Sequence, residues 1–187
     1  MIGSRRVEGY VIVSSDGMIA DASGVMPASI RNDTDQKFFQ DGLDRAALVL
    51  HGRHSHEGGP RAARRKRLIL TRQVAAIAPD PAHPNSLLWN PAGATIDQAI
   101  AELGAPDGAI APIGGTEVFS MFLPVYDAFH LSHAAHAKIP DGRPVFAGVG
   151  PGLTPEDLLA RHGLRAGPQR ALDEAAGITL VTWERAS

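Results

Sequence analysis

The sequence predicts an α/β protein with a mixed, mainly parallel central sheet and helices on both of its faces. Apolar runs of strand length, each bounded by turn residues, alternate with short helical patterns along the chain, as they do where helical crossovers join parallel strands. Several runs are apolar at nearly every position, as strands covered on both faces must be. Because 187 residues suffice for one well-buried domain and not for two ordinary ones, we expect a single domain over residues 1–187.

Seven segments are expected to form strands because each is largely apolar and ends at turn residues: residues 10–13, 46–50, 68–70, 86–89, 109–113, 128–132 and 178–183. No full-length crossover helix precedes residues 172–185. This segment is therefore expected to run antiparallel at or near an edge of the sheet. Prolines crowd residues 79–91, which indicates a surface loop around a short strand.

Helical patterns occupy four segments between these strands: residues 33–41, 95–103, 116–123 and 154–161. The third segment is introduced by Thr116. In the fourth, Thr154 is expected to be the N-cap, because Pro155 follows at the first helical position and Asp157 at the third.

The composition excludes several classes of function. The absence of cysteine excludes disulfides, cysteine nucleophiles and cysteine-ligated metals. A net charge of −2 does not indicate a nucleic-acid-binding surface, and positive charge is instead local, in residues 61–67. No apolar run approaches the roughly 18 residues of a membrane helix, and the first residues do not resemble a secretory signal. We therefore expect a cytoplasmic protein of bacterial type that binds neither membranes nor nucleic acid.

The most informative motif is an apolar run that stops at Gly114 and Gly115 and restarts as a helix at Thr116. A strand that ends in adjacent glycines and opens a helix brings free backbone N–H groups close to an anionic ligand. A glycine pair is also common in ordinary turns. The surrounding sequence must therefore decide between a phosphate site and a plain turn.

Residues 113–133 resemble the segment of dihydrofolate reductases that runs from the Gly-Gly cofactor turn through a helix into a Leu-Thr-His strand, here Leu131-Ser132-His133. Three other pieces follow the order of that family: residues 52–57 (its Gly-Arg-x-Thr-x-Glu), residues 65–72 (its Arg-x-x-Ile-Val-Leu-Ser/Thr strand) and residues 95–100 (its next helix). Residues 14–20 also resemble the Ser-x-Asp-Gly-x-Ile-Ala of the riboflavin-pathway pyrimidine reductases of the same superfamily. The resemblance implies the three-layer dihydrofolate reductase-like fold, with an antiparallel C-terminal strand.

The resemblance implies NADPH as cofactor, and in the family the bond between the two glycines is cis. The turn at residues 52–55 would open a helix and hold the pyrophosphate, while Arg53 and Arg72 would flank the 2′-phosphate that distinguishes NADPH from NADH. The alternative for both arginines is a solvated surface charge. The residues implied to contact the cofactor are Ile19, Ala20, Gly52, Arg53, His54, Ser55, Thr71, Arg72, Ile113, Gly114, Gly115, Thr116, Glu117 and Val118.

Reduction of a C=N bond also requires a proton source, which the family places on its first helix, hydrogen-bonded to the hydroxyl of the Leu-Thr-His strand. Ser132 supplies that hydroxyl here. Either Asp33 or Asp35 is the acid, since Asp33 has the expected distance from Pro27 and Asp35 the expected distance from Phe39, and we prefer Asp33. The alternative for such an aspartate is a helix-capping charge.

The substrate slot is implied to be lined by Ile12, Met26, Phe39, Arg65 and Phe119. The family carries tryptophan where Ala28 stands and tyrosine where Phe119 stands, which weakens the case for dihydrofolate itself. Arg65 has the position of the arginine that grips the folate carboxylate. It could equally receive a ribose phosphate or be one charge of a solvated run.

Other chemistries are not favoured. His51, His54 and His56 have no carboxylate near them except Glu57, and His130 and His133 would point to opposite faces of a strand, so no metal site is expected. No Gly-x-Ser-x-Gly motif supports a serine hydrolase. The sequence therefore predicts an NADPH-dependent reductase of a pterin- or pyrimidine-type heterocycle, in folate or riboflavin metabolism. The alternative is a non-catalytic nucleotide-binding or regulatory protein, and the resemblance implies a homodimer.

Overall fold

The computed structural model describes residues 2–3, 5–55 and 59–186. Its α-helices are α1 (Asp33–Arg45), α2 (Ile96–Leu103), α3 (Thr116–Phe122) and α4 (Pro155–Arg161), and its 3₁₀ turns are η1 (Ala28–Ile30), η2 (Ala62–Arg64) and η3 (Leu123–Val125). The strands are β1 (Glu8–Ser14), β2 (Met18–Ala20), β3 (Leu48–Gly52), β4 (Arg67–Leu70), β5 (Ile77–Pro79), β6 (Ser86–Trp89), β7 (Ile110–Pro112), β8 (Ala128–Ala134), β9 (Arg143–Pro144), β10 (Leu164–Ala166), β11 (Arg170–Asp173) and β12 (Ile178–Arg185). All seven expected strands and all four expected helices are present among them.

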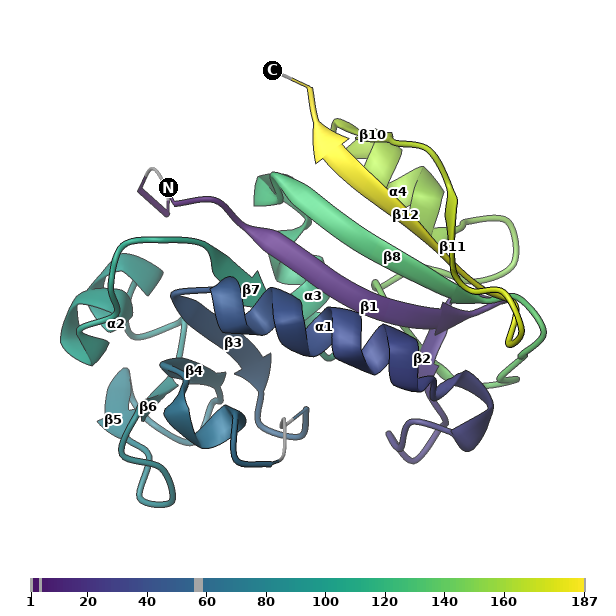
Figure 1. Ribbon diagram of the computed structural model, residues 1–187. Coiled ribbons are helices and arrows are strands. Elements are labelled where there is room, and N and C mark those ends of the chain that lie inside the picture. Colours follow the sequence, from purple (N-terminus) through teal and green to yellow (C-terminus); the bar gives the residue numbers. More distant parts are fainter. Residues whose placement is uncertain (1, 4, 56–58, 187) are drawn as a thin grey trace.

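The strands form two main groups, ordered β5-β6-β4-β3-β7 and β1-β8-β12-β10, with β11 also paired to β12. The groups meet where the Ile110 N–H donates to the Arg6 carbonyl at 2.8 Å and where Val7 forms a parallel bridge with Ile110, so β7 lies beside β1 (Figure 1). The pairs β1–β8, β3–β4, β3–β7 and β4–β6 are parallel. The mixed sheet expected from the sequence is therefore confirmed, with parallel pairs at its centre and antiparallel pairs toward both ends.

Strand β12 is antiparallel to β8, as expected for the C-terminal strand, with Leu180 opposite Ser132. It lies one strand inside the edge, because β10 and β11 cover its other side. Both of these covering strands are short, and only one of their residues, Leu164 of β10, is fully buried. They lack the apolar run that marks a buried strand, and the sequence pattern did not indicate them.

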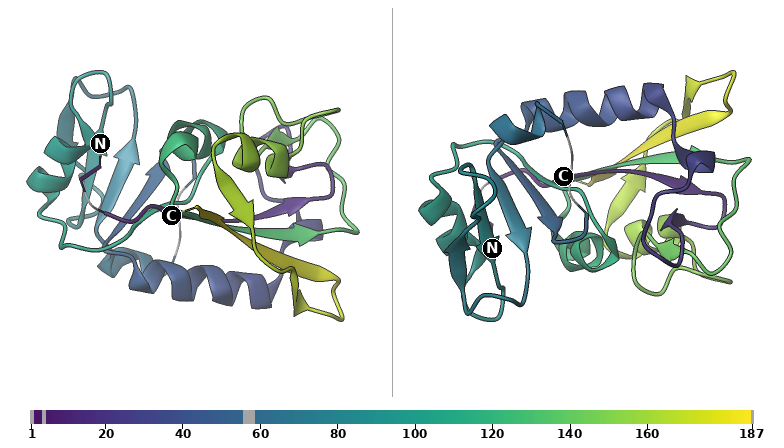
Figure 2. Two further views of the ribbon diagram at one scale, coloured as in Figure 1. Left: turned by 90° about the horizontal axis from the view of Figure 1, so that it is seen from above. Right: turned by 90° about the horizontal axis from the view of Figure 1, so that it is seen from below.

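Helix α1 covers one face of the sheet, and α3 and α4 lie on the opposite face (Figure 2). The residues of α1 that are buried toward the sheet are Asp35, Gly42 and Leu43, which share one side of the helix because seven or eight residues make about two turns. Gly42 is needed there, since a Cβ atom on it would lie 2.5 Å from the Tyr10 ring. The close approach of α1 to β1 therefore depends on a missing side chain.

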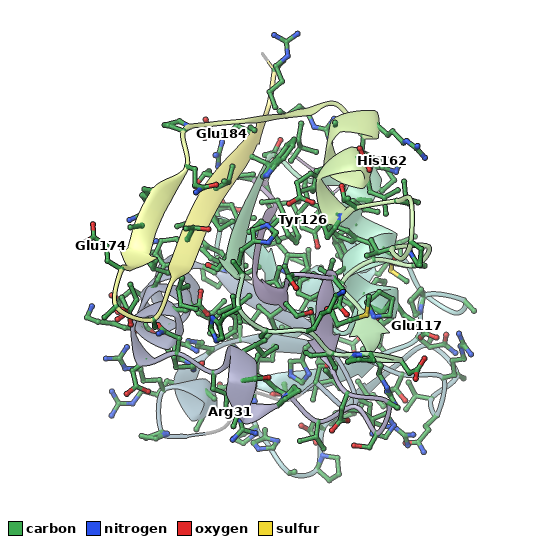
Figure 3. All side chains as sticks on the ribbon, turned by 90° about the vertical axis from the view of Figure 1, so that its right-hand side faces the viewer. Arg31, Glu117, Tyr126, His162, Glu174 and Glu184 are labelled. Carbon is green, nitrogen blue, oxygen red and sulfur yellow. The ribbon has the colours of Figure 1, made fainter. Side chains whose placement is uncertain are left out.

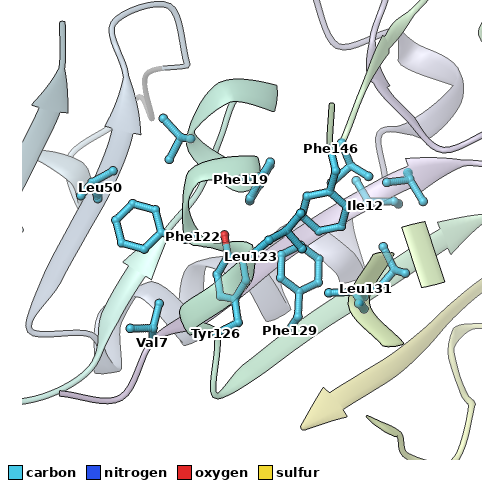
Figure 4. Close-up of a cluster of buried hydrophobic side chains, with 14 of the residues drawn as sticks. Val7, Ile12, Leu50, Phe119, Phe122, Leu123, Tyr126, Phe129, Leu131 and Phe146 are labelled. Atoms are coloured by element: carbon cyan, nitrogen blue, oxygen red, sulfur yellow. The ribbon is translucent and has the colours of Figure 1, made fainter. Parts of the chain in front are cut away.

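Aromatic side chains fill the core between the sheet and α3 (Figure 4). Phe129 of β8 lies at the centre, with ring centroids 4.9 Å from Tyr126, 5.1 Å from Phe146 and 5.8 Å from Phe119. Burying one such ring contributes about 1.5–3 kcal/mol. This cluster provides the rigid base for the Gly114–Gly115 turn, which opens α3.

No helix in the described part of the chain is long and apolar enough to cross a membrane. The expected N-cap of α4 is found, since Thr154 accepts a hydrogen bond from the Asp157 N–H, and Thr95, which was not singled out as a cap in the sequence, caps α2 in the same way. In both helices the third residue bonds back to the N-cap backbone and completes a capping box.

Candidate active site

Two turns meet at the carboxyl ends of β3 and β7, which are parallel neighbours with Leu50 opposite Pro112. The Gly52 N–H donates to the Gly114 carbonyl at 2.8 Å, and the Ser55 N–H donates to the Gly52 carbonyl at 2.9 Å. A Cβ atom on Gly115 would lie 3.1 Å from the Ser55 hydroxyl. The glycine therefore lets the backbone of one turn approach the hydroxyl of the other.

The Gly114–Gly115 peptide is cis, as the resemblance implies. Gly114 has φ +111°, and a Cβ atom on it would lie 2.8 Å from the Phe119 ring. Phe119 and Val118 are almost fully buried in the core beneath the turn. They support the turn from inside, and their expected contacts with substrate and cofactor stay predictions.

The residues on either side of the glycine turn are held in place by hydrogen bonds. Thr116 donates its hydroxyl to the Pro144 carbonyl of β9, and the Ile113 N–H donates to the Leu50 carbonyl at 2.9 Å. Glu117 is exposed. Thr116 thus ties the start of α3 to the short β2–β9 sheet.

Arg53 and Arg72 are exposed near these turns. Arg53 Nη2 lies 3.0 Å from His54 Nε2, and Arg72 Nη2 lies 3.8 Å from the exposed Glu117 carboxylate. Thr71, next to Arg72, is buried, and its backbone N–H donates to the Trp89 carbonyl at 2.9 Å. The two guanidinium groups are weakly held and can turn toward an anion, which also fits the alternative of solvated surface charges.

The helix that the resemblance implies after Ser55 is not found among the described residues. His56 and Glu57, which the motif includes, lie outside those residues. From residue 59 onward the next helical element is the short turn η2 (Ala62–Arg64). Among the described residues, the N–H groups that could bind a phosphate on this side of the site are therefore those of the turn at residues 52–55.

Asp35 and Ser132 face one another between α1 and the sheet. Asp35 is 7% exposed and Ser132 is 1% exposed. Burial raises the pKa of Asp35 above its ordinary value, and the neighbouring Ser132 hydroxyl lowers it in part. Ser132 Oγ forms no hydrogen bond of standard geometry within the described residues, which leaves it available to the neighbouring Asp35 carboxyl group.

Asp33, the preferred acid, does not occupy this position. It is the first residue of α1 and is exposed, because two residues along a helix turn a side chain to the far side. Asp35 instead shares the buried side of α1 with Leu43. The pairing of Asp33 with Ser132 is therefore wrong, and Asp35 is the aspartate that the fold places beside Ser132.

The other expected substrate contacts are placed unequally. Ile12 is buried beside Ser132, opposite it in the β1–β8 pair, and Phe39 is half-buried one helical turn after Asp35. Met26 is 37% exposed in the loop before η1. Ile19 and Ala20, expected at the cofactor, lie in β2, where Ala20 pairs with Arg143.

Arg65 does not face this slot. Its Nη2 donates to Gln40 Oε1 at 2.9 Å, its Nε donates to Asp44 Oδ1 at 3.2 Å, and the residue is only 8% exposed. A buried guanidinium held by two residues of α1 cannot receive a substrate carboxylate without breaking those bonds. In this structure Arg65 anchors α1 to the segment before β4, and this geometry does not support its expected role in substrate binding.

The histidines do not converge. Among the described residues no group of three or more His, Cys, Asp or Glu side chains could hold a metal ion. His130 Nδ1 lies 3.1 Å from Thr182 Oγ1 on the α1 side of the sheet, while His133 Nε2 lies 2.9 Å from Glu156 of α4 on the other side. Burial lowers the pKa of His130 to about 4.

Two polar residues near the site were missed from the sequence. Asp16, within the Ser-x-Asp-Gly motif, accepts hydrogen bonds from the Ser14 hydroxyl at 2.5 Å and the Ile139 N–H at 3.1 Å, and so fixes the β1–β2 turn. Asn32 caps α1 by accepting from the Asp35 N–H at 3.0 Å. An asparagine directly before a helical pattern is a strong N-cap signal, and it agrees with the expected start of this helix at residue 33.

A cavity of about 800 Å³ lies beside Asn32, between η1, the end of β8 and the β11–β12 turn. It does not include the glycine turns. Figure 3 shows Glu174, which lines the cavity, and Glu117, which follows the Gly114–Gly115 turn, at opposite edges of the molecule. The expected cofactor wall is thus a separate surface from this cavity.

No family model and no curated protein matches this sequence. Solved structures match the fold at TM-scores of 0.64–0.65 over 97% of the chain. They include a diaminohydroxyphosphoribosylaminopyrimidine deaminase/5-amino-6-(5-phosphoribosylamino)uracil reductase from Thermotoga maritima (15% identity), of which the chain spans 57%. They also include a dihydrofolate reductase from Enterococcus faecalis complexed with NADP(H) and RAB-propyl (15% identity, 97% of that chain).

A third structure of this kind is a putative riboflavin biosynthesis protein from Shewanella sp. PV-4, at 17% identity over 99% of that chain. The chain therefore has the dihydrofolate reductase-like fold. Its structural relatives include both a dihydrofolate reductase and riboflavin-pathway proteins, which are the two groups that the sequence motifs resemble.

Proposed function

We propose that this protein is an NADPH-dependent reductase that transfers hydride to a pterin- or pyrimidine-type heterocycle, in the manner of dihydrofolate reductase or 5-amino-6-(5-phosphoribosylamino)uracil reductase. The observation that carries the proposal is the buried Asp35 beside the Ser132 hydroxyl, between α1 and the sheet. A carboxyl group kept from water with a raised pKa is suited to proton transfer near neutral pH.

The two glycine turns fit the cofactor. NADPH, when bound, supplies the hydride. Gly114 and Gly115 would lie against its pyrophosphate and nicotinamide, and Ser55 with the Gly52 turn would bind the pyrophosphate through backbone N–H groups and a hydroxyl. Arg53 and Arg72, both exposed and weakly held, would flank the 2′-phosphate.

Asp35 would protonate the ring nitrogen of the substrate or hold a water that does so. In its neutral form the carboxyl group can donate a proton, and in its ionised form it would pair with a protonated ring. Ser132, on the sheet beneath, would orient the carboxyl group. Ile12 and Phe39 would flank the flat ring on either side of this pair.

The alternative is a nucleotide-binding protein that keeps the cofactor turns and lacks the acid. A protein without this chemistry gains nothing from a buried carboxyl group, because removing such a group from water costs free energy. The placement of Asp35 next to Ser132 therefore favours the enzyme.

Two measurements test the proposal. Calorimetry should detect NADPH binding, and the loss of NADPH absorbance should report turnover with dihydrofolate or with 5-amino-6-(5-phosphoribosylamino)uracil. Asp35→Asn should lower turnover by about 100-fold or more, whereas Asp33→Asn, a matched control on the exposed side of α1, should leave it unchanged. If calorimetry detects no NADPH binding, the proposal is wrong. If NADPH binds but is not oxidised with either substrate, the result supports the nucleotide-binding alternative.

A further inference from the structure

Asn32 uses both ends of its side chain amide at the start of α1. Its Oδ1 accepts a hydrogen bond from the Asp35 N–H at 3.0 Å, and its Nδ2 donates to Asp173 Oδ2 at 2.8 Å. The second bond joins residues that are 141 positions apart in the sequence. One amide thus links the helix that carries Asp35 to the β11–β12 hairpin.

Asp173 is itself fixed within that hairpin. Its Oδ1 accepts from the Ala176 N–H at 3.0 Å, and Asp173 pairs with Ile178 at the start of β12. The hydrogen bond from Asn32 and that from Ala176 lower the pKa of Asp173, so it remains a carboxylate that accepts from Asn32.

The same strand β12 borders the strand of Ser132. Ile178 lies opposite Ala134 and Leu180 lies opposite Ser132 in the β8–β12 pair. The chain of contacts from Asp35 through Asn32 and Asp173 to β12 therefore ends beside the hydroxyl that faces Asp35. These contacts therefore connect Asp35 on α1 to Ser132 on β8 through residues outside the slot.

We propose that Asn32 is a positioning residue that sets the place of Asp35 relative to Ser132 by clamping the start of α1 to the β11–β12 hairpin. The proposal rests on the reductase function proposed above. Asparagine suits this role because its amide offers an acceptor for an N–H group and a donor for a carboxylate. Serine also caps helices well, but it is too short to keep the bond to Asp173.

This difference gives the test. Asn32→Ser keeps the cap and cuts the clamp without adding charge, so water should reach Asp35. Carbon NMR of the Asp35 carboxyl group should then show a pKa lower by about half a unit or more, because less burial favours the ionised form. Turnover should fall by about 10-fold at an unchanged KM for NADPH, since the acid is misplaced while the cofactor turns are intact.

Asp173→Ala should give the same shift, and the double variant with Asn32→Ser should add nothing further, because both changes remove one hydrogen bond. Among the described residues, burial and Ser132 are what shift the pKa of Asp35. If the charge of Asp173 acted on Asp35 directly, the effect of Asp173→Ala would persist in the Asn32→Ser background, and the proposal would fail.

Thr154→Ala is the matched control, since Thr154 caps α4 on the opposite face of the sheet, where its hydroxyl accepts from the Asp157 N–H at 3.1 Å. It should lower stability and leave the pKa of Asp35 and turnover unchanged. An unaltered Asp35 pKa in Asn32→Ser would overturn the proposal even in an active enzyme. A shifted pKa in a protein that oxidises no NADPH would support the positioning role and refute the reductase function.

Discussion

Gly42→Ala is expected to damage stability and turnover together, because Gly42 sets the distance between α1 and the sheet. The new Cβ atom would lie 2.5 Å from Cε1 and 2.7 Å from Cζ of Tyr10. Carbon atoms in contact prefer about 3.5–4.0 Å, so helix or ring must move by about 1 Å. The ring is restrained by stacking on His130, with centroids 4.5 Å apart, and by donating its hydroxyl to Glu8 at 2.7 Å.

Helix α1 is therefore expected to move, and it carries Asp35 two turns earlier. Overpacking of this kind costs about 1–3 kcal/mol of unfolding free energy, even though alanine by itself favours a helix over glycine by about 1 kcal/mol. A 1 Å misplacement of a catalytic group can lower turnover by about 100-fold. The loss of stability and the loss of turnover therefore have the same cause, a shift of α1 by about 1 Å.

Urea unfolding and NADPH oxidation, measured on the same preparations, check this prediction. Gln36→Ala, on the exposed side of α1, is the control and should change neither quantity appreciably. Gly42→Ala combined with Tyr10→Leu should recover turnover, because the ring that blocks the helix is gone. Wild-type stability and turnover in Gly42→Ala would refute the reasoning.

Three further predictions concern charged residues. Because burial raises the pKa of Asp35, its contribution to stability is full below the ordinary pKa of 3.8 and is lost as the pH rises through the folded-state pKa. Asp35→Asn should therefore become more stable relative to the wild type over that range, measured by urea unfolding at a series of pH values, and a difference independent of pH would contradict the raised pKa. The double variant Arg53→Ala with Arg72→Ala should narrow the preference for NADPH over NADH by about 10-fold or more, because it removes charge-assisted hydrogen bonds to the 2′-phosphate. If calorimetry finds the preference unchanged, both arginines are solvated surface charges. Arg65→Met should lower the melting temperature and leave the substrate KM unchanged, since Arg65 anchors α1, and a raised KM at wild-type stability would restore its role in substrate binding.

Much of the fold was accessible from the sequence because its central strands are buried on both sides. Residues 86–89 were expected as a strand and form β6 with the same bounds, and the Thr154 cap of α4 was predicted from three positions within one helical turn. Strands such as β9, with two residues and no buried side chain, exist only through their partners. Local pattern carries no information about them.

The glycine turns were easier to locate than the buried aspartate. Gly114 and Gly115 form a contiguous motif whose strand and helix can be read directly, whereas the choice between Asp33 and Asp35 depends on which side of α1 packs on the sheet. The expected start of the helix at residue 33 is confirmed, but the side that is buried depends on tertiary contacts such as the hydrogen bond from Asn32 to Asp173 of the distant β11–β12 hairpin. A contact between residues so far apart in the sequence could not be predicted from a local pattern.

The position of β8 between β1 and β12 has a consequence for the order of folding. Ser132 pairs with Ile12 on one side and Leu180 on the other, so its strand is completed by segments about 120 residues before it and about 50 residues after it. Contacts of such long range form slowly, since a large loop must close before they contribute. During synthesis on the ribosome the glycine turns can form while β12 is still in the exit tunnel. The sheet beneath Asp35 is completed only after β12 has emerged. We therefore expect nascent chains to form the glycine turns before Asp35 is placed beside Ser132.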